Sequence, residues 1–505
     1  MRSASLRPLR FSPSPWQLLL LDAVAGAVGI ALAMLLRFID EGSVPATYAQ
    51  RLLPWLVLAA AIQIGVGEVM NRLRKPGSAL ARRPVAPFAV ATALSLVVVL
   101  TINDVVLHEP WRLPHLVAII GPLLAAVASA ALRMAAARSI DVEELLTRPL
   151  IHLDVAACAT VLAGKRVLIT GAAGSIGAEL GRQVLAVGPA SLTAVDMNET
   201  GLFELEADLQ GAARGSIPVR TSIADVTDPR RMLELFLRER PEVVFHAAAY
   251  KHVPLVEANP DQGFVTNVLG TLSVCEAAVA AGAERVVVIS TDKAVNPSSF
   301  MGLTKRVAEL MVVAIGQAVA PGTILSAVRF GNVLGSRGSV VPTLLRQIEA
   351  GGPITITHPD AQRFFMTISE AASLVLLSAA FGTSGRLFVL DMGQEVRIGQ
   401  LAERLVRLRG LRPGRDVTIK YIGLRPGEKL REELHSSDER LLPTDRAAVW
   451  RVEPNYTVDP DTLLDGVRLL DERRRAGTLE PADYPGLLRA LIERAVHTQD
   501  ALTAR

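Results

Sequence analysis

The stretch Lys165-Arg-Val-Leu-Ile-Thr170, followed at once by Gly171-Ala-Ala-Gly-Ser-Ile-Gly177, decides the fold of this 505-residue chain. Its first six residues form a short apolar run that is typical of a buried parallel strand. The glycines come directly after this run and open a helical pattern that continues to about Val187. In a unit of this kind the turn and the helix N-terminus hold a phosphate group. The stretch therefore predicts the start of a nucleotide-binding α/β domain.

The chain from residue 165 onward alternates strand and helix patterns. The strand patterns predict strands at 167–170, 192–196, 219–223, 243–246, 286–290 and 324–329. This alternation predicts an α/β fold with a Rossmann-type doubly wound parallel sheet, mainly within 165–330. Glycine- and proline-rich segments interrupt the pattern after Phe330, so 331–505 is predicted to be a smaller substrate-binding lobe that ends in helices.

The glycine turn and the ends of the next two strands supply the candidate cofactor contacts. The glycines are spaced as GxxGxxG, which resembles the short-chain dehydrogenase/reductase superfamily; a purely structural glycine turn is the alternative. Asp196 ends the second strand and would bind the adenosine ribose hydroxyls, which favours NAD over NADP because a carboxylate repels a 2′-phosphate. Asp225 would meet the adenine, although a helix N-cap is a rival role, better placed at Asp228. The predicted contacts are Gly171, Gly174, Ser175, Ile176, Gly177, Asp196 and Asp225.

The first 137 residues are predicted to be a transmembrane region. A mean hydropathy of +0.34 with 20% charged residues is too apolar for a soluble enzyme of this size. The apolar excess lies in four stretches, at about 16–36, 52–70, 86–102 and 113–137. A membrane-spanning helix needs about 20 such residues. A cleaved signal peptide would explain the first stretch only. Residues 138–164 then form a connector to the catalytic domain at 165–505.

Loop charges predict the orientation of these helices. Basic residues precede the first apolar stretch and separate the second from the third, namely Arg2, Arg7, Arg10, Arg72, Arg74, Lys75, Arg82 and Arg83. The positive-inside rule then places both chain ends in the cytoplasm, with the protein in the inner membrane. Asp22 and Glu68 lie near helix ends, so packing or interfacial roles are favoured over intramembrane catalysis. The net charge of +3 does not indicate nucleic-acid binding, and Cys158 and Cys275 have no metal-ligand spacing.

The run Ser290-Thr-Asp-Lys293 follows the fifth predicted strand, and the helix that begins near Met301 carries Lys305. In a doubly wound sheet, chemistry takes place where strand carboxyl ends meet the helices that follow. Oxidation of an alcohol needs one proton acceptor. The Asp292–Lys293 pair indicates a second proton transfer, as in elimination of water. An exposed ion pair without a catalytic role is the alternative.

These motifs together resemble the bacterial membrane-bound nucleotide-sugar 4,6-dehydratases of polysaccharide biosynthesis, the CapD-like extended short-chain dehydrogenases. The resemblance covers nearly all of the chain from Lys165 to about Leu434. The matching pieces are Gly171-Ala-Ala-Gly-Ser-Ile-Gly177, Asp196-Met-Asn-Glu199, Ala224-Asp-Val226, His246-Ala-Ala-Ala-Tyr-Lys-His-Val-Pro254, Asn267-Val-Leu-Gly-Thr271, Ser290-Thr-Asp-Lys293, Arg329-Phe-Gly-Asn-Val-Leu-Gly-Ser-Arg-Gly-Ser-Val-Val-Pro342, Arg363-Phe-Phe-Met-Thr367 and Arg425-Pro-Gly-Glu-Lys429.

The resemblance implies a reaction and a set of roles. NAD takes hydride from C4 of a UDP-sugar, UDP-N-acetylglucosamine being expected, water leaves across C5–C6, and the hydride returns to C6. Asp292 would protonate the departing C6 hydroxyl, and Lys293 would remove the C5 proton if its surroundings lower its pKa. Thr291 would bond the sugar O4, and Lys305 the nicotinamide ribose. Met301 occupies the superfamily's tyrosine position and cannot transfer a proton.

The nucleoside diphosphate needs cations, and a guanidinium matches phosphate oxygens. Arg337 and Arg425 are the leading candidates for the pyrophosphate. The wider predicted substrate set is Lys251, Asn332, Arg337, Ser339, Arg363, Arg425 and Glu428. His246 is expected to be a hydrogen-bonded core histidine.

Two alternative functions stay open. A UDP-sugar 4-epimerase needs no elimination step, and a catalytically silent NAD-binding membrane scaffold would explain Met301. The long forms of the family carry a second nucleotide-binding-like domain, where this chain has only the connector at 138–164. The implied partners are a UDP-sugar and the lipid bilayer, and homo-oligomerisation is left open.

Overall fold

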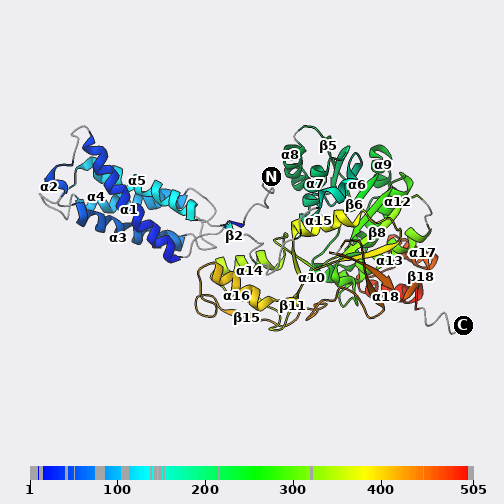
Figure 1. The fold of residues 1–505 in the computed structure, drawn as a ribbon. Helices are drawn as coiled ribbons and strands as arrows, with labels where there is room; N and C mark the ends of the chain where they lie inside the picture. The colour runs from blue at the N-terminus through cyan, green and yellow to red at the C-terminus, as the bar shows by residue number, and fades with distance from the viewer. Residues whose placement is uncertain are drawn as a thin grey trace. The chain divides into compact units, whose positions relative to one another are not determined.

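The computed structural model describes residues 9–10, 15–39, 44–49, 52–73, 86–103, 113–136, 139–140, 145, 151, 154–213, 215–318, 322–446 and 448–498 (Figure 1). The chain forms two compact units. One comprises Met1–Glu144 with Arg346–Ile354 and Glu403–Ile419, and the other comprises Leu145–Leu345, Thr355–Ala402 and Lys420–Arg505.

Helices form at each of the four apolar stretches of the first unit. They are α1 (Pro15–Arg37), α3 (Leu52–Leu73), α4 (Ala86–Thr101) and α5 (His115–Ala136), with the short α2 (Ala46–Ala49) and a strand pair of β1 (Leu9–Arg10) and β2 (Ser139–Ile140). Both α1 and α4 pack against α3 and α5. A Cβ at Gly29 would meet the carbonyl oxygen of Gly121 at 2.5 Å, so this glycine lets α1 and α5 approach closely.

Polar side chains inside this bundle are hydrogen-bonded to one another. Asp22 is 2% exposed and accepts a hydrogen bond from Ser129 Oγ at 2.5 Å, which agrees with the packing role expected for it. Gln63 donates to Ser95 at 3.1 Å. The side chain of Glu68 and the charged loops used for orientation lie outside the described part of the structure, apart from the backbone of Arg10 and Arg72.

Two helical segments in the described residues are long and apolar enough to cross a membrane. Leu20–Arg37 belongs to α1. Pro260–Ala280 belongs to the α/β unit, where two thirds of it (67%) is buried, as expected for a core helix. The apolar segments Leu52–Val66 and His115–Ser129 are shorter. Helical conformation at all four stretches is therefore established, and four membrane crossings remain a prediction.

The α/β unit is built on a nine-stranded sheet. Its order is β16–β17–β13–β8–β7–β6–β3–β4–β5. The strands are β3 (Arg166–Thr170), β4 (Ser191–Asp196), β5 (Val219–Ile223), β6 (Val243–His246), β7 (Arg285–Ile289), β8 (Ile324–Arg329), β13 (Arg386–Leu390), β16 (Glu439–Pro443) and β17 (Val449–Pro454). All pairs from β13 to β5 are parallel, and β17 and β16 add antiparallel strands. The strand order reverses between β3 and β6, which is the topological switch point of a Rossmann-type sheet.

Helices cover both faces of the sheet. One layer contains α6 (Val155–Leu162), α7 (Ser175–Val187), α8 (Glu199–Ala213) and α15 (Ile368–Ser378). The other contains α9 (Pro229–Glu239), α12 (Gly270–Ala280) and α13 (Phe300–Ala318), and α17 (Pro460–Arg475) and α18 (Tyr484–Ala495) pack outside α13. The six strands predicted from sequence agree with the structure to within one residue at each end, so the α/β prediction is confirmed.

The remaining elements are short. They are α10 (Val253–Ala258), α11 (Pro260–Gly263), the π-helical turn η4 (Phe264–Leu269), the 3₁₀ turns η5 (Asp292–Ala294) and η6 (Pro481–Asp483), β9 (Asn332–Leu334), α14 (Val340–Glu349), β10 (Ile354–Ile356), β11 (Gln362–Arg363), β12 (Phe365–Thr367), β14 (Val396–Arg397), α16 (Ile398–Leu408), β15 (Ile419–Tyr421), β18 (Tyr456–Val458) and β19 (Val496–Thr498).

A buried ion network joins β8 to the added strand β16. Arg329 is fully buried and donates to Glu309 of α13 at 2.7 Å through both Nε and Nη2. Its Nη1 donates to Glu439 of β16 at 2.6 Å. Ser290, at the end of β7, donates to Glu309 at 2.7 Å. The network therefore fixes the segment before β16 against the strand that leads to Asp292.

Candidate active site

The glycine turn after β3 has the backbone geometry of a phosphate-binding loop. Gly171 has φ +68°, and a Cβ there would collide with the backbone of Ala248. A Cβ at Gly177 would collide with the carbonyl oxygen of Gly171. Gly174 is the N-cap of α7, so Ser175 and its successors start the helix with their N–H groups available to an anion. The turn thus fits the pyrophosphate of a dinucleotide.

Asp196 is held at the end of β4, beside this turn. Its Oδ2 accepts a hydrogen bond from Ala173 N and its Oδ1 accepts one from Asn198 N, both at 2.9 Å. Asp225 accepts from Thr227 N in the turn after β5. Asp228, rather than Asp225, caps α9 by accepting from Arg230 N and Arg231 N. The N-cap alternative therefore applies to Asp228, as the sequence suggested.

Directly after β7, the buried Asp292 contacts Lys293, whose side chain is partly buried. Asp292 is fully buried in the turn η5, and its Oδ1 accepts hydrogen bonds from Lys293 Nζ and Thr291 Oγ1, both at 2.9 Å. Its Oδ2 is also buried and, within the described part of the chain, has no hydrogen-bond partner. An exposed ion pair is therefore excluded as a description of these two residues.

The ammonium of Lys293 is surrounded by acceptors. Besides Asp292, Nζ contacts Asn332 Oδ1 at 3.2 Å and Glu432 Oε1 at 3.4 Å. Burial opposes the charge, but the carboxylates of Asp292 and Glu432 outweigh it and raise the pKa of Lys293. A base at this position was expected to need a lowered pKa. The pKa shift of Lys293 is therefore opposite in direction to that expectation.

Lys305 and Met301 lie on the buried face of α13. Lys305 Nζ donates to the carbonyl of Ile289 at 2.6 Å, and burial lowers its pKa to about 8 despite the opposing Glu309. Met301 is 3% exposed and belongs to the hydrophobic core of the unit. Its side chain therefore packs and has no means of moving a proton.

His246 is a hydrogen-bonded core residue, as expected. Its ring nitrogens lie 2.7 Å from Thr170 Oγ1 and 3.1 Å from Thr271 Oγ1. Burial lowers its pKa to about 3, so the ring stays neutral. Asn267, in the π-helical turn η4, bonds the backbone N and O of Tyr250 at 2.8 and 3.0 Å and fixes the segment that follows β6.

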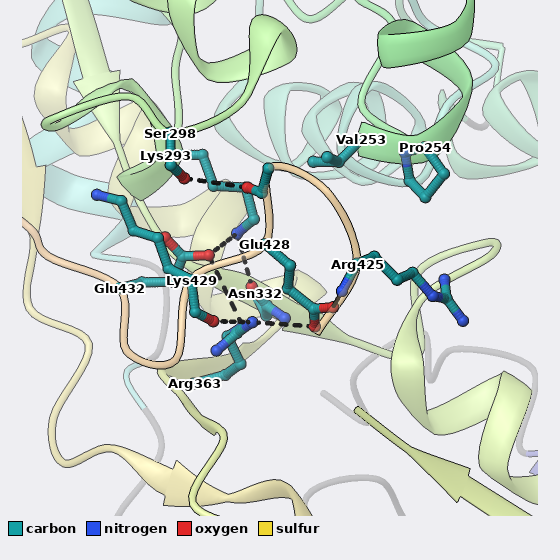
Figure 2. A pocket seen from close by; sticks show the side chains of 11 residues that line it. Val253, Pro254, Lys293, Ser298, Asn332, Arg363, Arg425, Glu428, Lys429 and Glu432 are labelled. Carbon is teal, nitrogen blue, oxygen red and sulfur yellow. Dashed lines mark hydrogen bonds and ion pairs between the residues drawn. The ribbon is translucent and has the colours of Figure 1, made fainter. Parts of the chain in front are cut away.

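A pocket of about 190 Å³ opens beside Lys293 (Figure 2). It is lined by Val253, Pro254, Lys293, Ser298, Asn332, Arg363, Arg425, Gly427, Glu428, Lys429 and Glu432. Four predicted substrate residues are in this wall, namely Asn332, Arg363, Arg425 and Glu428. Lys251, Arg337 and Ser339 are not in it. The backbone N of Arg337 instead donates to Ser175 Oγ at 3.1 Å, which places this arginine beside the glycine turn.

The guanidinium groups of the two pocket arginines, Arg363 and Arg425, differ in how far they are already engaged in hydrogen bonds within the protein. Arg363 is 6% exposed, and its guanidinium already donates to the carbonyls of Gln362, Lys429 and Leu430 and to Glu428. It therefore holds the loop at 428–432. Arg425 is exposed, and Figure 2 shows its guanidinium extending away from Arg363 and Glu432. Of the pair, Arg425 is the one positioned to meet a phosphate.

Glu432 is a site residue that the sequence reasoning missed. Its side chain is 2% exposed, and Oε1 lies 3.4 Å from Lys293 Nζ and 3.7 Å from Arg363 Nε. Burial raises the pKa of Glu432; Lys293 opposes this shift and Asp292 adds to it. In the sequence, Glu432 stands in a loop without strand or helix periodicity, three residues after the Arg425–Lys429 motif. Only tertiary structure brings it to Lys293.

The family model described as "Polysaccharide biosynthesis protein" matches residues 167–454. The capsular polysaccharide biosynthesis protein CapD of Staphylococcus aureus is 45% identical over 302 residues, which are 60% of this chain and 50% of that protein. The probable polysaccharide biosynthesis protein EpsC of Bacillus subtilis (strain 168) is 45% identical over 371 residues, 73% of this chain and 59% of that protein.

An uncharacterized membrane protein of Methanocaldococcus jannaschii is 46% identical over 280 residues, 54% of this chain and 81% of that protein. Among solved structures, Pen from Bacillus thuringiensis superposes with a TM-score of 0.53 at 32% identity, covering 58% of this chain and 88% of that one. The chain thus spans 50% and 59% of the lengths of CapD and EpsC. The chain belongs to the polysaccharide biosynthesis protein family, as a CapD-like member of the short-chain dehydrogenase/reductase superfamily.

Proposed function

We propose that this protein is an NAD-dependent 4,6-dehydratase of a UDP-sugar, with UDP-N-acetylglucosamine as the first candidate substrate, acting in polysaccharide or glycan biosynthesis. The observation that carries the proposal is the contact between the buried Asp292 and the partly buried Lys293 beside the pocket. Elimination of water needs an acid and a base on one substrate, and these two side chains supply both.

The cofactor assignment is supported by the glycine turn and by Asp196. Bound NAD would accept hydride from C4 and return it to C6. Gly171, Gly174 and Gly177 leave room for the pyrophosphate, Lys305 lies close to the end of β7, and Asp196 disfavours a 2′-phosphate. NAD is therefore preferred to NADP.

Asp292 can account for the proton of the sugar 4-hydroxyl, which Met301 cannot take. Thr291 Oγ1 donates to Asp292 Oδ1, so a proton that leaves O4 through the Thr291 hydroxyl reaches this carboxylate. Asp292 then carries the proton that the C6 hydroxyl needs in order to leave as water. One residue thus serves as proton acceptor first and as general acid second.

Lys293 is proposed to remove the C5 proton, which the C4 ketone makes acidic, and to return a proton to C5 at the end. Protonation of Asp292 neutralises one of the two carboxylates that hold the ammonium of Lys293. Protonation of Asp292 therefore prepares the general acid and, at the same time, favours loss of the proton from Lys293.

The test is to incubate the protein with NAD and UDP-N-acetylglucosamine in deuterated water and to identify the product by NMR. A UDP-4-keto-6-deoxy sugar with deuterium at C5 is expected. The C4 epimer with its original C5–H bond would contradict the proposal.

A UDP-sugar 4-epimerase is the second candidate. The UDP-glucose 4-epimerase of Rickettsia typhi is 35% identical over 292 residues, which are 57% of this chain and 82% of that protein. Epimerisation requires oxidation, rotation and reduction at C4 only. Epimerisation at C4 has no use for a base beside C5. Because the Asp292–Lys293 contact offers such a base together with an acid, it favours dehydration.

Asp196→Ala is expected to weaken NAD binding and to reduce the preference for NAD over NADP. The substitution removes the carboxylate that would bind the ribose hydroxyls and repel the 2′-phosphate. Calorimetric titration with each dinucleotide measures both effects. Asp228→Ala is the control, because it removes an α9 N-cap and should cost about 1 kcal/mol of stability without changing the preference. Stronger binding of NADP than NAD by the unaltered protein would contradict the assignment.

The membrane region is proposed to cross the inner membrane four times, with both ends in the cytoplasm. The basic loops predict this orientation. A reporter fused after Arg505 should therefore be active only in the cytoplasm. Activity of an export-dependent reporter at the same position would reverse the topology.

A further inference from the structure

Glu432 places a second carboxylate against Lys293. Its Oε1 lies 3.4 Å from Nζ, and it comes from the loop after Lys429, whereas Asp292 comes from the turn after β7. Figure 2 shows the Lys293 ammonium reached by an oxygen of Glu432 and by Asn332. The lysine therefore contacts two carboxylates, and only Asp292 has a role in the reaction so far.

The surroundings of Glu432 leave one of its oxygens unsatisfied. Oε2 is buried and, among the described residues, lacks a hydrogen-bond partner. Burying an ionised oxygen without a donor is costly, and adding a proton removes the charge that causes the cost. The charged groups that face Glu432 are Lys293 and Asp292 after β7, Arg363 of β11 and Lys429 of its own loop. Burial and the nearby Asp292 raise the pKa of Glu432, in agreement with this geometry.

The two cations next to Glu432 differ in whether they can give up a proton. An arginine stays protonated in proteins, and the guanidinium of Arg363 is also held by three carbonyls. A lysine can lose its proton when its surroundings favour the neutral form. Of the two cations in contact with Glu432, Lys293 is therefore the one that can exchange a proton with it.

We propose that Glu432 is a positioning residue that takes the surplus proton of Lys293 in each turnover and later returns it. The inference rests on the proposed function, in which Lys293 is the C5 base. An N–H bond of the ammonium breaks and an O–H bond forms on Glu432, giving a neutral amine and a neutral carboxylic acid with no change in net charge. The amine removes the C5 proton while Asp292 protonates the departing hydroxyl. After the amine has returned a proton to C5, Glu432 gives back the one it took.

Glu432→Gln tests this proposal, because the amide keeps the shape but cannot accept the proton. Dehydration at neutral pH should fall by about 10²-fold. C4 oxidation uses Asp292 and should continue, so the absorbance of reduced nicotinamide should accumulate after UDP-N-acetylglucosamine is added. Dehydration should also recover by about tenfold per pH unit toward alkaline pH, since Lys293 must then lose its proton to solvent.

Glu433→Gln is the matched control. Glu433 is the next residue, is about half exposed (51%), and pairs with Asn296 and Lys429 rather than with Lys293. It should leave the rate and its pH dependence unchanged. A Glu432→Gln enzyme that dehydrates the sugar at the wild-type rate and with the wild-type pH profile would overturn the inference.

The unaltered enzyme gives a second test that does not depend on how a variant folds. Proton exchange within the pair predicts a dehydration rate that is level across neutral pH. A rate that rises about tenfold per pH unit would show that Lys293 loses its proton to solvent, and would overturn the inference. The proposed function fails separately, when the unaltered enzyme forms no 6-deoxy product; the role of Glu432 then falls with it.

Discussion

Replacement of Asp292 by Asn is expected to reduce turnover of the UDP-sugar by about 10²- to 10⁴-fold while sugar binding persists. The amide is of similar size and can keep the hydrogen bonds to Lys293 and Thr291, but it can neither take the 4-hydroxyl proton nor deliver one to the departing water. Product formation measured by NMR, and UDP-sugar affinity measured by calorimetry, separate the loss of chemistry from a loss of binding.

Lys293→Met should cause a loss of similar size, because it removes the base and keeps most of the side-chain volume. Met301→Leu is the control, since it removes only a sulfur from a core side chain and should retain substantial activity. Oxidation and dehydration that survive in both Asp292→Asn and Lys293→Met would place the acid and base elsewhere, with Tyr250 as the next candidate.

The second large effect is expected on stability, from Arg329→Met. The substitution removes the fully buried arginine of this network and leaves Glu309 and Glu439 with Arg306 as their remaining shared cation. Breaking a buried ion pair by removing one partner typically costs about 3–5 kcal/mol. Denaturant unfolding, followed by the fluorescence of the α/β unit, measures the loss. Arg451→Met on β17 is the control, because its ion pair with Glu453 is solvent-exposed and should contribute less than about 1 kcal/mol.

The same network has a defined pH dependence. Hydrogen bonds and charge from Arg329 outweigh burial and lower the pKa of Glu439 from 4.5 to about 2. Because the folded-state pKa is depressed, this contribution to stability is complete above about pH 4.5 and is lost as the pH falls toward 2. Arg329→Met should reduce this acid-side contribution, with Arg306 and the backbone N–H of Ser436 keeping part of it. Equal stability of the variant and the parent at neutral pH would show that the network does not hold β16 in place.

The sequence predicted the six strands from 167 to 329 because five of them are short, mainly apolar runs next to a glycine or a polar strand end. The remaining one, Val219–Ile223, contains Arg, Thr and Ser and fits the alternation of strands and helices. It missed β13, β16 and β17. Strands β16 and β17 belong to the edge of the sheet, where half-exposed residues alternate weakly, and the glycines and prolines between 331 and 430 obscured the periodicity. The expectation of a separate substrate lobe did not include strands that extend the Rossmann sheet itself.

The sequence alone could predict those site residues that are neighbours along the chain and directly follow a strand. Thr291, Asp292 and Lys293 follow a strand directly, so their place at its carboxyl end follows from topology. Glu432 reaches Lys293 from more than a hundred residues further along the chain, and the contacts of Arg363 with the same loop join residues 65 to 67 positions apart. No periodic pattern encodes such a contact, and the raised pKa of Lys293 comes in part from it.

The segment from Gly427 to Glu439 is attached to the rest of the unit at several points. Ser298 bonds the carbonyl of Gly427, Lys429 bonds that of Val295, and Glu439 bonds Arg329. Glu432 lies between these attachments. During synthesis, Asp292 and Lys293 therefore leave the ribosome well before the carboxylate that completes their surroundings. A nascent chain cannot bring Glu432 to Lys293 in this arrangement until the segment up to residue 439 has emerged, so the proposed dehydration would have to wait for that segment.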